Sequence, residues 1–256
     1  MKAVILADGY GTRLSEETSD KPKAMVEIGG LPILWYIMKG FSAFGVKKFV
    51  IAAGYRAEVI KNFFVSYNYR SQDLKIDLLN NEIVVNEKNR EDWIIQVIDT
   101  GRDVETGARL YRLKHLLEGE RFFLTYGDGV CDVNLYDLVK FHESASSIAT
   151  LTAVRPPARF GSLELEEDKV SRFAEKSQAS EGWINGGFFV LEPQIFDYLE
   201  DSVSCVFESS PLEKLASKSA LAAFRHEGFW QCMDTLRDLR LLRTLWEQET
   251  PPWKVW

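Results

Sequence analysis

Short apolar runs alternate with segments of helical periodicity along the first part of the chain. Residues 2–7 form an apolar run that ends at Asp8, which is the pattern of a parallel strand buried on both faces. After Pro32, apolar residues recur at helical spacing as far as Gly45, a residue that favours the end of a helix. Residues 49–53 form a second apolar run. This alternation predicts a parallel sheet whose strands are joined by right-handed crossovers.

The alternation continues toward the C-terminus after an irregular stretch at residues 68–99. We expect further helices at residues 59–67, 110–117, 135–141 and 235–248, and further strands at residues 121–126, 148–154 and 184–191. Within the irregular stretch, residues 74–79 and 83–85 are predicted to pair as a hairpin. The aromatic tail at residues 251–256 is too apolar to extend freely into water, so we expect it to pack against the body or a neighbouring subunit.

The composition is that of a globular chain with an excess of acidic residues. Its 256 residues include 31 basic and 38 acidic side chains, which gives a formal charge of -7. At about 150 residues per domain, this length predicts one large domain or a main domain with a small appendage. The acidic balance argues against binding to nucleic acid, which requires a contiguous basic face. Any phosphate bound here is expected to be small and locally held.

Membrane insertion and zinc binding are also disfavoured. The apolar run at residues 33–38 is far shorter than the ~18 residues that a transmembrane helix requires. The first residues lack the longer apolar core of a secretory signal, so the chain is expected to be cytoplasmic. Cys131, Cys205 and Cys232 are widely separated, and no histidine stands at ligand spacing beside them, which indicates free thiols and no zinc site.

The loop after the first strand carries a candidate phosphate site. In parallel sheets, ligands bind at the carboxyl ends of the strands. Gly9 and Gly11 would let backbone N–H groups approach phosphate oxygens, and Arg13 adds a guanidinium for the same oxygens. Lys21 and Lys23 follow on a loop stiffened by a proline. The combination predicts triphosphate binding, with an ordinary charged surface turn as the alternative.

Two common nucleotide motifs are excluded by their spacing. A dinucleotide-binding G-x-G-x-x-G sequence would need glycine at the position of Leu14, and no G-x-x-x-x-G-K-[ST] sequence occurs. Residues 6–14 and 21–23 instead resemble the signature of the sugar-1-phosphate nucleotidylyltransferases and, within that family, of the cytidylyltransferases that act on glucose 1-phosphate. The likeness continues at residues 25–30, 32–35, 99–101, 125–130, 159–161, 184–191, 228–231 and 233–238.

The resemblance implies a particular α/β fold. It is a Rossmann-like, mixed and mostly parallel sheet flanked by helices, of the nucleotide-diphospho-sugar transferase type, with a small β-rich region on the sugar side. Residues 1–147 would form the nucleotide-binding core. Residues 148–256 would form the sugar-phosphate-binding and C-terminal region, continuous with the same sheet.

The resemblance also implies an enzyme, assembled as a homo-oligomer, that joins CTP and glucose 1-phosphate to give CDP-glucose and pyrophosphate with Mg²⁺. Because both reacting phosphates are anionic, such a site must supply cations and N–H donors rather than a catalytic base. Two alternatives stay open. The chain could use UTP, dTTP or another sugar 1-phosphate, or it could be a nucleotide-binding paralogue without turnover.

The matching motifs assign roles to individual residues. The catalytic residues implied are Arg13, Lys23, Asp128 and Asp234. Asp128 and Asp234 would hold the metal through hard carboxylate oxygens, although an Asp in either sequence context is also a common turn former or helix N-cap. The nucleotide would contact Leu6, Ala7, Asp8, Gly9, Gly11, Thr12, Arg13, Lys23, Thr106, Arg109 and Gly127. The sugar phosphate would contact Gly161, Glu175, Lys176, Asn185 and Gly186.

The chain departs from the family pattern at four positions. Asp8 replaces the glycine or alanine that is usual in the phosphate loop. A carboxylate beside a triphosphate is electrostatically adverse unless it points away, binds the base or ribose, or meets a cation. Ala108 replaces a glycine near Arg109, the residue expected to donate to the cytosine carbonyl, and Ser177 and Cys232 each replace a proline.

Overall fold

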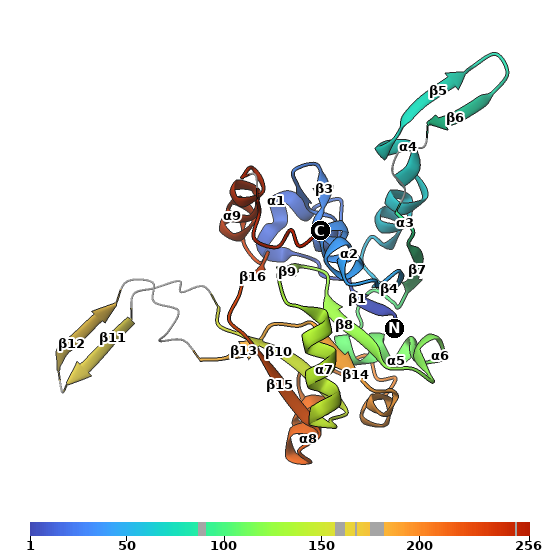
Figure 1. The fold of residues 1–256 in the computed structure, drawn as a ribbon. Coiled ribbons are helices and arrows are strands. Elements are labelled where there is room, and N and C mark those ends of the chain that lie inside the picture. Colours follow the sequence, from blue (N-terminus) through green and yellow to red (C-terminus); the bar gives the residue numbers. More distant parts are fainter. Residues whose placement is uncertain (87–90, 157–161, 167, 175–181, 249) are drawn as a thin grey trace.

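One mixed sheet of eight strands forms the centre of the molecule (Figure 1). The computed structural model describes residues 1–86, 91–156, 162–166, 168–174, 182–248 and 250–256. The strands lie in the order β13 (Ile184–Asn185), β10 (Ala149–Val154), β14 (Phe189–Leu191), β8 (Phe122–Tyr126), β1 (Ala3–Leu6), β4 (Lys48–Ala53) and β7 (Ile94–Asp99), and β15 (Leu221–His226) pairs with β10. The pairs β8–β1, β1–β4, β4–β7 and β10–β15 are parallel, which confirms the expected mixed, mostly parallel sheet.

Alternate side chains of β1 enter two separate apolar layers. Ala3 and Ile5 pack with residues of α2 (Ile33–Ala43), α3 (Ala57–Val65), α7 (Leu135–Ala145) and α9 (Leu236–Trp246). Val4 and Leu6 pack on the opposite face with residues of α5 (Thr106–Arg112), α6 (Lys114–Leu117) and α8 (Ser210–Ser217). Helices therefore cover both faces of the sheet, and the doubly buried strand expected at residues 2–7 is confirmed.

Three elements differ from the sequence-based expectation. The strand expected at residues 184–191 is split into β13 and β14, because Gly187 and Phe188 adopt left-handed backbone angles between them (φ 77° and 47°). The helix expected at residues 110–117 is two short helices, α5 and α6. Strand β7 lies in the stretch described above as irregular, where its alternating half-exposed residues gave too weak an apolar signal.

Short ladders and helices complete the fold around the sheet. The remaining ladders are β2 (Glu27–Ile28) with β3 (Leu31–Pro32), β5 (Asp73–Asp77) with β6 (Glu82–Asn86), β11 (Ser162–Glu166) with β12 (Lys169–Ala174), and β9 (Gly129–Cys131) with β16 (Trp230–Cys232). The remaining helices are η1 (Thr12–Leu14), α1 (Ser15–Thr18), η2 (Lys23–Met25), α4 (Tyr67–Ser71) and η4 (Pro193–Tyr198). The hairpin β5–β6 confirms the predicted pairing and projects away from the body beyond α4 (Figure 1).

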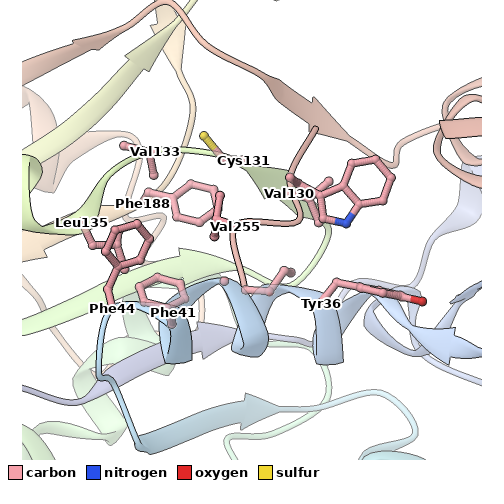
Figure 2. A pocket seen from close by; sticks show the side chains of 12 residues that line it. Tyr36, Phe41, Phe44, Val130, Cys131, Val133, Leu135, Phe188 and Val255 are labelled. Carbon is pink, nitrogen blue, oxygen red and sulfur yellow. The ribbon is translucent and has the colours of Figure 1, made fainter. Parts of the chain in front are cut away.

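The aromatic tail packs against the body of the same chain, which is one of the two arrangements expected from its sequence. Trp253 is 1% exposed and stacks on Phe229 and Trp246. Val255 lines a small apolar pocket together with aromatic residues of α2 (Figure 2). The tail therefore extends the apolar layer beneath α2. Among the described residues, no helix is both long and apolar enough to cross a bilayer.

Strands from both sides of residue 147 share the central sheet, since β10 and β14 are joined to β8 through continuous pairing. The two regions of the chain are thus structurally continuous. The division of roles between a nucleotide-binding core and a sugar-phosphate-binding region stays a prediction.

Candidate active site

Two aspartates that are remote in sequence are placed side by side by a short ladder. Asp128 lies between β8 and β9, and Asp234 follows β16. Strand β16 pairs antiparallel with β9, and the Met233 N–H extends this pairing by donating to the Asp128 carbonyl at 2.8 Å. Because the ladder fixes both backbones, the two carboxylates are positioned at the carboxyl end of the central strands.

The ammonium group of Lys23 lies between these two carboxylates. Its Nζ donates to Asp128 Oδ2 at 2.6 Å and also to Asp234 Oδ1. Burial opposes the charge of Lys23, but the two carboxylates outweigh it and hold the Lys23 pKa above its ordinary value. For Asp234, burial favours the neutral acid, yet the hydrogen bond and charge of Lys23 hold its pKa below the ordinary value. A positive charge is therefore stabilised at this point.

The same two carboxylates suit a divalent cation. Each offers hard oxygen ligands, and each already has one oxygen at hydrogen-bond distance from a single cationic atom, Lys23 Nζ. Mg²⁺ prefers such oxygen ligands and retains several waters, so two protein carboxylates with phosphate oxygens make a suitable donor set. Asp128 and Asp234 therefore fit a Mg²⁺ ion. Lys23 would have to release at least one of these carboxylates when the ion binds.

The phosphate loop is tied to this centre by backbone contacts. The Lys23 N–H donates to the Gly9 carbonyl at 3.0 Å, and the Gly127 N–H donates to the Leu6 carbonyl at 2.8 Å. A Cβ on Gly127 would lie 2.9 Å from that carbonyl oxygen, so only glycine allows the loops after β1 and β8 to approach so closely. The predicted phosphate loop thus borders Lys23 and the residue before Asp128.

Gly11 gives the phosphate loop its turn. It has a left-handed backbone (φ 62°), and its carbonyl accepts a hydrogen bond from Thr18 Oγ1 at 2.9 Å. Thr12 and Arg13 are exposed on this turn, and the positive charge of Arg13 contributes to the lowered pKa of Asp234. The charge of Arg13 therefore acts on Asp234, one of the two aspartates.

Asp8 forms an ion pair with Arg109 of α5. Its Oδ2 lies 2.7 Å from Arg109 Nη2. Burial raises the pKa of Asp8, and the nearby guanidinium opposes that rise only in part. Burial likewise lowers the pKa of Arg109, which is 1% exposed. The adverse carboxylate noted in the sequence is thus compensated by a cation.

A hydrogen-bond network links residues expected at the base with residues expected at the sugar. Thr106 Oγ1 donates to Glu208 Oε2 and Tyr126 Oη donates to Glu208 Oε1, both at 2.6 Å. Asn185 Nδ2 donates to Tyr126 Oη at 3.1 Å. Burial raises the pKa of Tyr126, so its hydroxyl stays protonated and able to donate. Thr106 and Asn185 are therefore joined through Glu208 and Tyr126.

Comparison with known proteins shows the family of this chain. The family described as nucleotidyl transferase matches residues 2–241. The chain belongs to this nucleotidyl transferase family. It is 47% identical, over the whole of both chains, to a glucose-1-phosphate cytidylyltransferase of Salmonella typhi. The family expectation drawn from the phosphate-loop motif is thus confirmed.

Solved structures share the fold of this nucleotidyl transferase. A UDP-glucose pyrophosphorylase from Acinetobacter baumanii superposes with a TM-score of 0.71, over 98% of this chain and 95% of that chain, at 16% identity. HddC from Yersinia pseudotuberculosis superposes with a TM-score of 0.67, over 95% of this chain and 98% of that chain, at 26% identity. The expected fold is thereby confirmed.

The expected site residues of the nucleotidyl transferase fall into three groups. Of the residues expected at a metal and the phosphates, Lys23, Asp128 and Asp234 meet, as described above. Gly186 is buried against β10, where a Cβ would lie 2.7 Å from Val154 Cγ1. Gly161, Glu175 and Lys176 lie outside the described residues. Glu208 was missed by sequence reasoning, because it falls outside every predicted element and no motif includes it.

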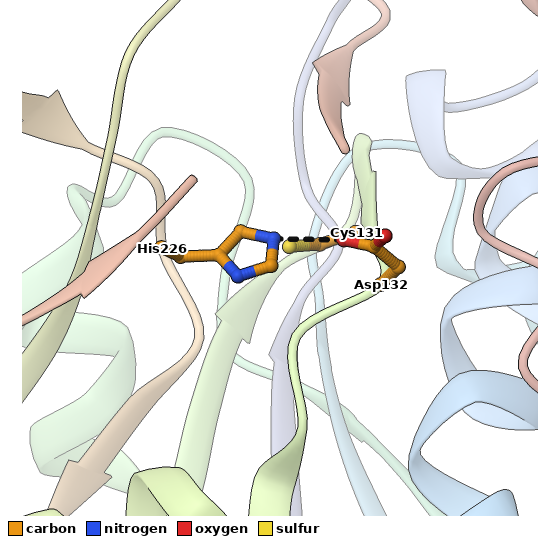
Figure 3. Close-up of side chains that lie close together, drawn as sticks. All are labelled: Cys131, Asp132 and His226. Carbon is orange, nitrogen blue, oxygen red and sulfur yellow. Dashed lines mark hydrogen bonds and ion pairs between the residues drawn. The ribbon is translucent and has the colours of Figure 1, made fainter. Parts of the chain in front are cut away.

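Cys131, Asp132 and His226 also lie close together beside the β9–β16 ladder (Figure 3). His226 Nε2 lies 2.8 Å from Asp132 Oδ1, and Cys131 Sγ is close to both. Burial raises the pKa of Cys131 above its ordinary range, so the thiol stays protonated. The Asp132–His226 pair joins the end of β15 to the residue after β9.

Proposed function

We propose that this chain joins CTP to α-D-glucose 1-phosphate, giving CDP-glucose and pyrophosphate. The observation that carries the proposal is the meeting of Lys23, Asp128 and Asp234 beside the loop after β1. The full-length relative from Salmonella typhi, named for this activity, supports the choice of substrates. The alternatives are the same chemistry with another nucleotide or sugar, and nucleotide binding without turnover.

The reaction forms one P–O bond and breaks another. A phosphate oxygen of the sugar 1-phosphate attacks the α-phosphorus of CTP, and the bond to the β-phosphate oxygen breaks as pyrophosphate leaves in line. Both partners are anions, so stabilising negative charge and aligning the two phosphates are the main requirements. Mg²⁺ held by Asp128 and Asp234 would neutralise developing charge on the phosphate oxygens.

The residues of this chain divide the remaining work. Arg13 and the backbone N–H groups of Gly9 and Gly11 hold the β- and γ-phosphates, which become the leaving group. With Mg²⁺ held by the two aspartates, Lys23 would be free to donate to a phosphate oxygen. Thr12 and the backbone of Leu6, Ala7 and Gly127 border the nucleotide. We place the sugar phosphate against Gly161, Glu175, Lys176, Asn185 and Gly186.

A pyrophosphate assay tests this function. Purified protein is incubated with Mg²⁺, glucose 1-phosphate and each nucleoside triphosphate in turn, with galactose 1-phosphate as the sugar control. We expect release of pyrophosphate with CTP and glucose 1-phosphate, and none when Mg²⁺ is removed with EDTA. Release with another nucleotide would reassign the substrate, and no release despite measurable CTP binding would overturn the proposal in favour of a binding protein.

We also propose that the chain self-associates through the hairpin β5–β6. Leu78 and Leu79 at its tip are 90% and 92% exposed, and Ile76, Ile83 and Val84 are each more than half exposed. An isolated two-stranded hairpin is only marginally stable in water. A second copy of the chain, with the same apolar ribbon, would cover these side chains and stabilise the pairing.

Replacing both tip residues, Leu78→Asp with Leu79→Asp, is expected to shift the protein to a smaller species. Two charges at an apolar contact would be buried without partners, which costs several kcal/mol. The measurement is the molar mass by light scattering after size exclusion. Leu241→Asp is the matched control, since Leu241 is also exposed (42%) but lies on α9. Equal masses for the wild type and the tip variant would contradict assembly through this hairpin.

A further inference from the structure

The ion pair between Asp8 and Arg109 places a carboxylate at the end of β1, within the nucleotide loop. Asp8 follows β1 directly, and Arg109 reaches it from α5. The side chain of Arg109 is 1% exposed, whereas that of Asp8 is 22% exposed. Of the two partners, Asp8 is therefore the one that a ligand in the loop can contact.

Arg109 has little capacity left for a nucleobase. Its Nη1 donates to Thr100 Oγ1 and to the Gly101 carbonyl, both at 2.7 Å. Its Nη2 donates to the Arg102 carbonyl at 3.0 Å and pairs with Asp8. These contacts use the four terminal N–H groups of the guanidinium. The remaining Nε is buried and has no partner among the described residues. Arg109 thus acts as a positioning residue, which holds Asp8 and the loop at residues 100–102.

The carboxylate that Arg109 holds can only accept hydrogen bonds when ionised. Cytosine presents an amino group at C4, which donates, whereas uracil and thymine present a carbonyl oxygen at the same position, which accepts. Carboxylates accordingly recognise cytosine through its amino group. A fixed carboxylate near the base therefore distinguishes these pyrimidines by the direction of one hydrogen bond.

We propose that Asp8 is a specificity-determining residue, whose carboxylate, fixed by Arg109, accepts a hydrogen bond from the 4-amino group of cytosine and repels the 4-carbonyl oxygen of uracil or thymine. This inference rests on the proposed function, because it requires a nucleoside triphosphate in the loop after β1. It explains how a negative charge is retained beside a triphosphate site. The charge is neutralised by a buried guanidinium and serves the base instead of the phosphates.

The test compares CTP with UTP in two variants, Asp8→Asn and Asp8→Gly. The Asn amide can turn its N–H₂ group toward a carbonyl oxygen, and glycine removes the side chain altogether. We expect the ratio of kcat/KM for CTP over UTP to fall by roughly 5- to 150-fold in both variants, which corresponds to ~1–3 kcal/mol of discrimination. Thermal unfolding shows that each variant is folded.

Asp103→Asn is the matched control. Asp103 is a nearby carboxylate that accepts from Tyr10 Oη at 2.5 Å instead of pairing with Arg109. Its removal changes the local charge equally, so CTP and UTP should be affected alike. A CTP-to-UTP ratio that stays within twofold of the wild type in both Asp8 variants would overturn the inference.

Binding measurements separate this inference from the proposed function. The dissociation constants of CTP and UTP are measured by calorimetry with Mg²⁺ and without sugar phosphate. A wild type that binds CTP more tightly than UTP, and Asp8 variants that lose this preference, would support the inference even if no pyrophosphate were released. Turnover with an unchanged preference in the variants would support the function and overturn the role of Asp8.

Discussion

Replacing Asp234 with asparagine is expected to lower kcat for pyrophosphate release by roughly 10³-fold. The amide lacks the negative charge that binds a divalent cation, and charge stabilisation by a catalytic metal amounts to several kcal/mol. A loss of ~4 kcal/mol corresponds to a 10³-fold lower rate. The measurement is the rate of pyrophosphate release at saturating CTP across a Mg²⁺ titration. We expect the variant to require more Mg²⁺ for its residual activity.

The matched control for this prediction is Asp132→Asn. Asp132 directly follows β9, close in sequence to Asp128, but its partner is His226 and not Lys23. Its rate is expected to stay within a few-fold of the wild type at a temperature where both proteins are folded. An Asp234→Asn variant that keeps more than a tenth of the wild-type rate would refute the role of this carboxylate in holding the metal.

The second large effect is expected from Lys23→Met. Removing a cation that stabilises phosphate charge typically lowers the rate by about 10²- to 10³-fold. The substitution also leaves Asp128 and Asp234 as neighbouring carboxylates without their ammonium partner. These two negative charges repel each other once the ammonium group between them is gone. The melting temperature of the variant in EDTA should therefore fall below that of the wild type.

Magnesium should reverse this loss of stability. In the wild type, Lys23 would compete with a bound metal for the same two oxygens, whereas in the variant that competition would be absent. The rise in melting temperature on addition of Mg²⁺ should therefore be larger for Lys23→Met than for the wild type. Lys39→Met serves as control, because Lys39 pairs with Glu91 and not with Asp128 or Asp234. An equal rise in melting temperature with Mg²⁺ for the wild type and Lys23→Met would contradict the idea that Lys23 and the metal bind the same two carboxylates.

Local sequence patterns predicted the elements that position the site. The apolar run that became β1 is buried on both faces, and its composition alone indicates this. The glycines of the following loop predicted a phosphate site, because close backbone approach requires them. The ordered motifs around these residues also indicated the family. The strand, the loop and the motifs each depend on residues that are close in sequence. The spacing of their apolar residues indicates which faces are buried.

Contacts between remote residues needed the tertiary structure. Nothing in the sequence states that β9 and β16 pair, yet that ladder places Asp128 beside Asp234. The sequence left open whether Asp8 points away from the phosphates, binds the base or ribose, or meets a cation, and the structure pairs it with the buried Arg109. Glu208 is joined to Thr106 and Tyr126 only because α5, β8 and the segment before α8 meet around it.

The sequence by itself therefore determined the strand, the phosphate loop and the family, since each is encoded in short-range spacing. The tertiary structure alone decided which charges face one another. Ion pairs form where packing of the whole sheet brings side chains within a few ångströms, and that packing depends on both apolar layers together. For this reason the cluster of Lys23, Asp128 and Asp234 belongs to the fold as a whole and not to any one segment.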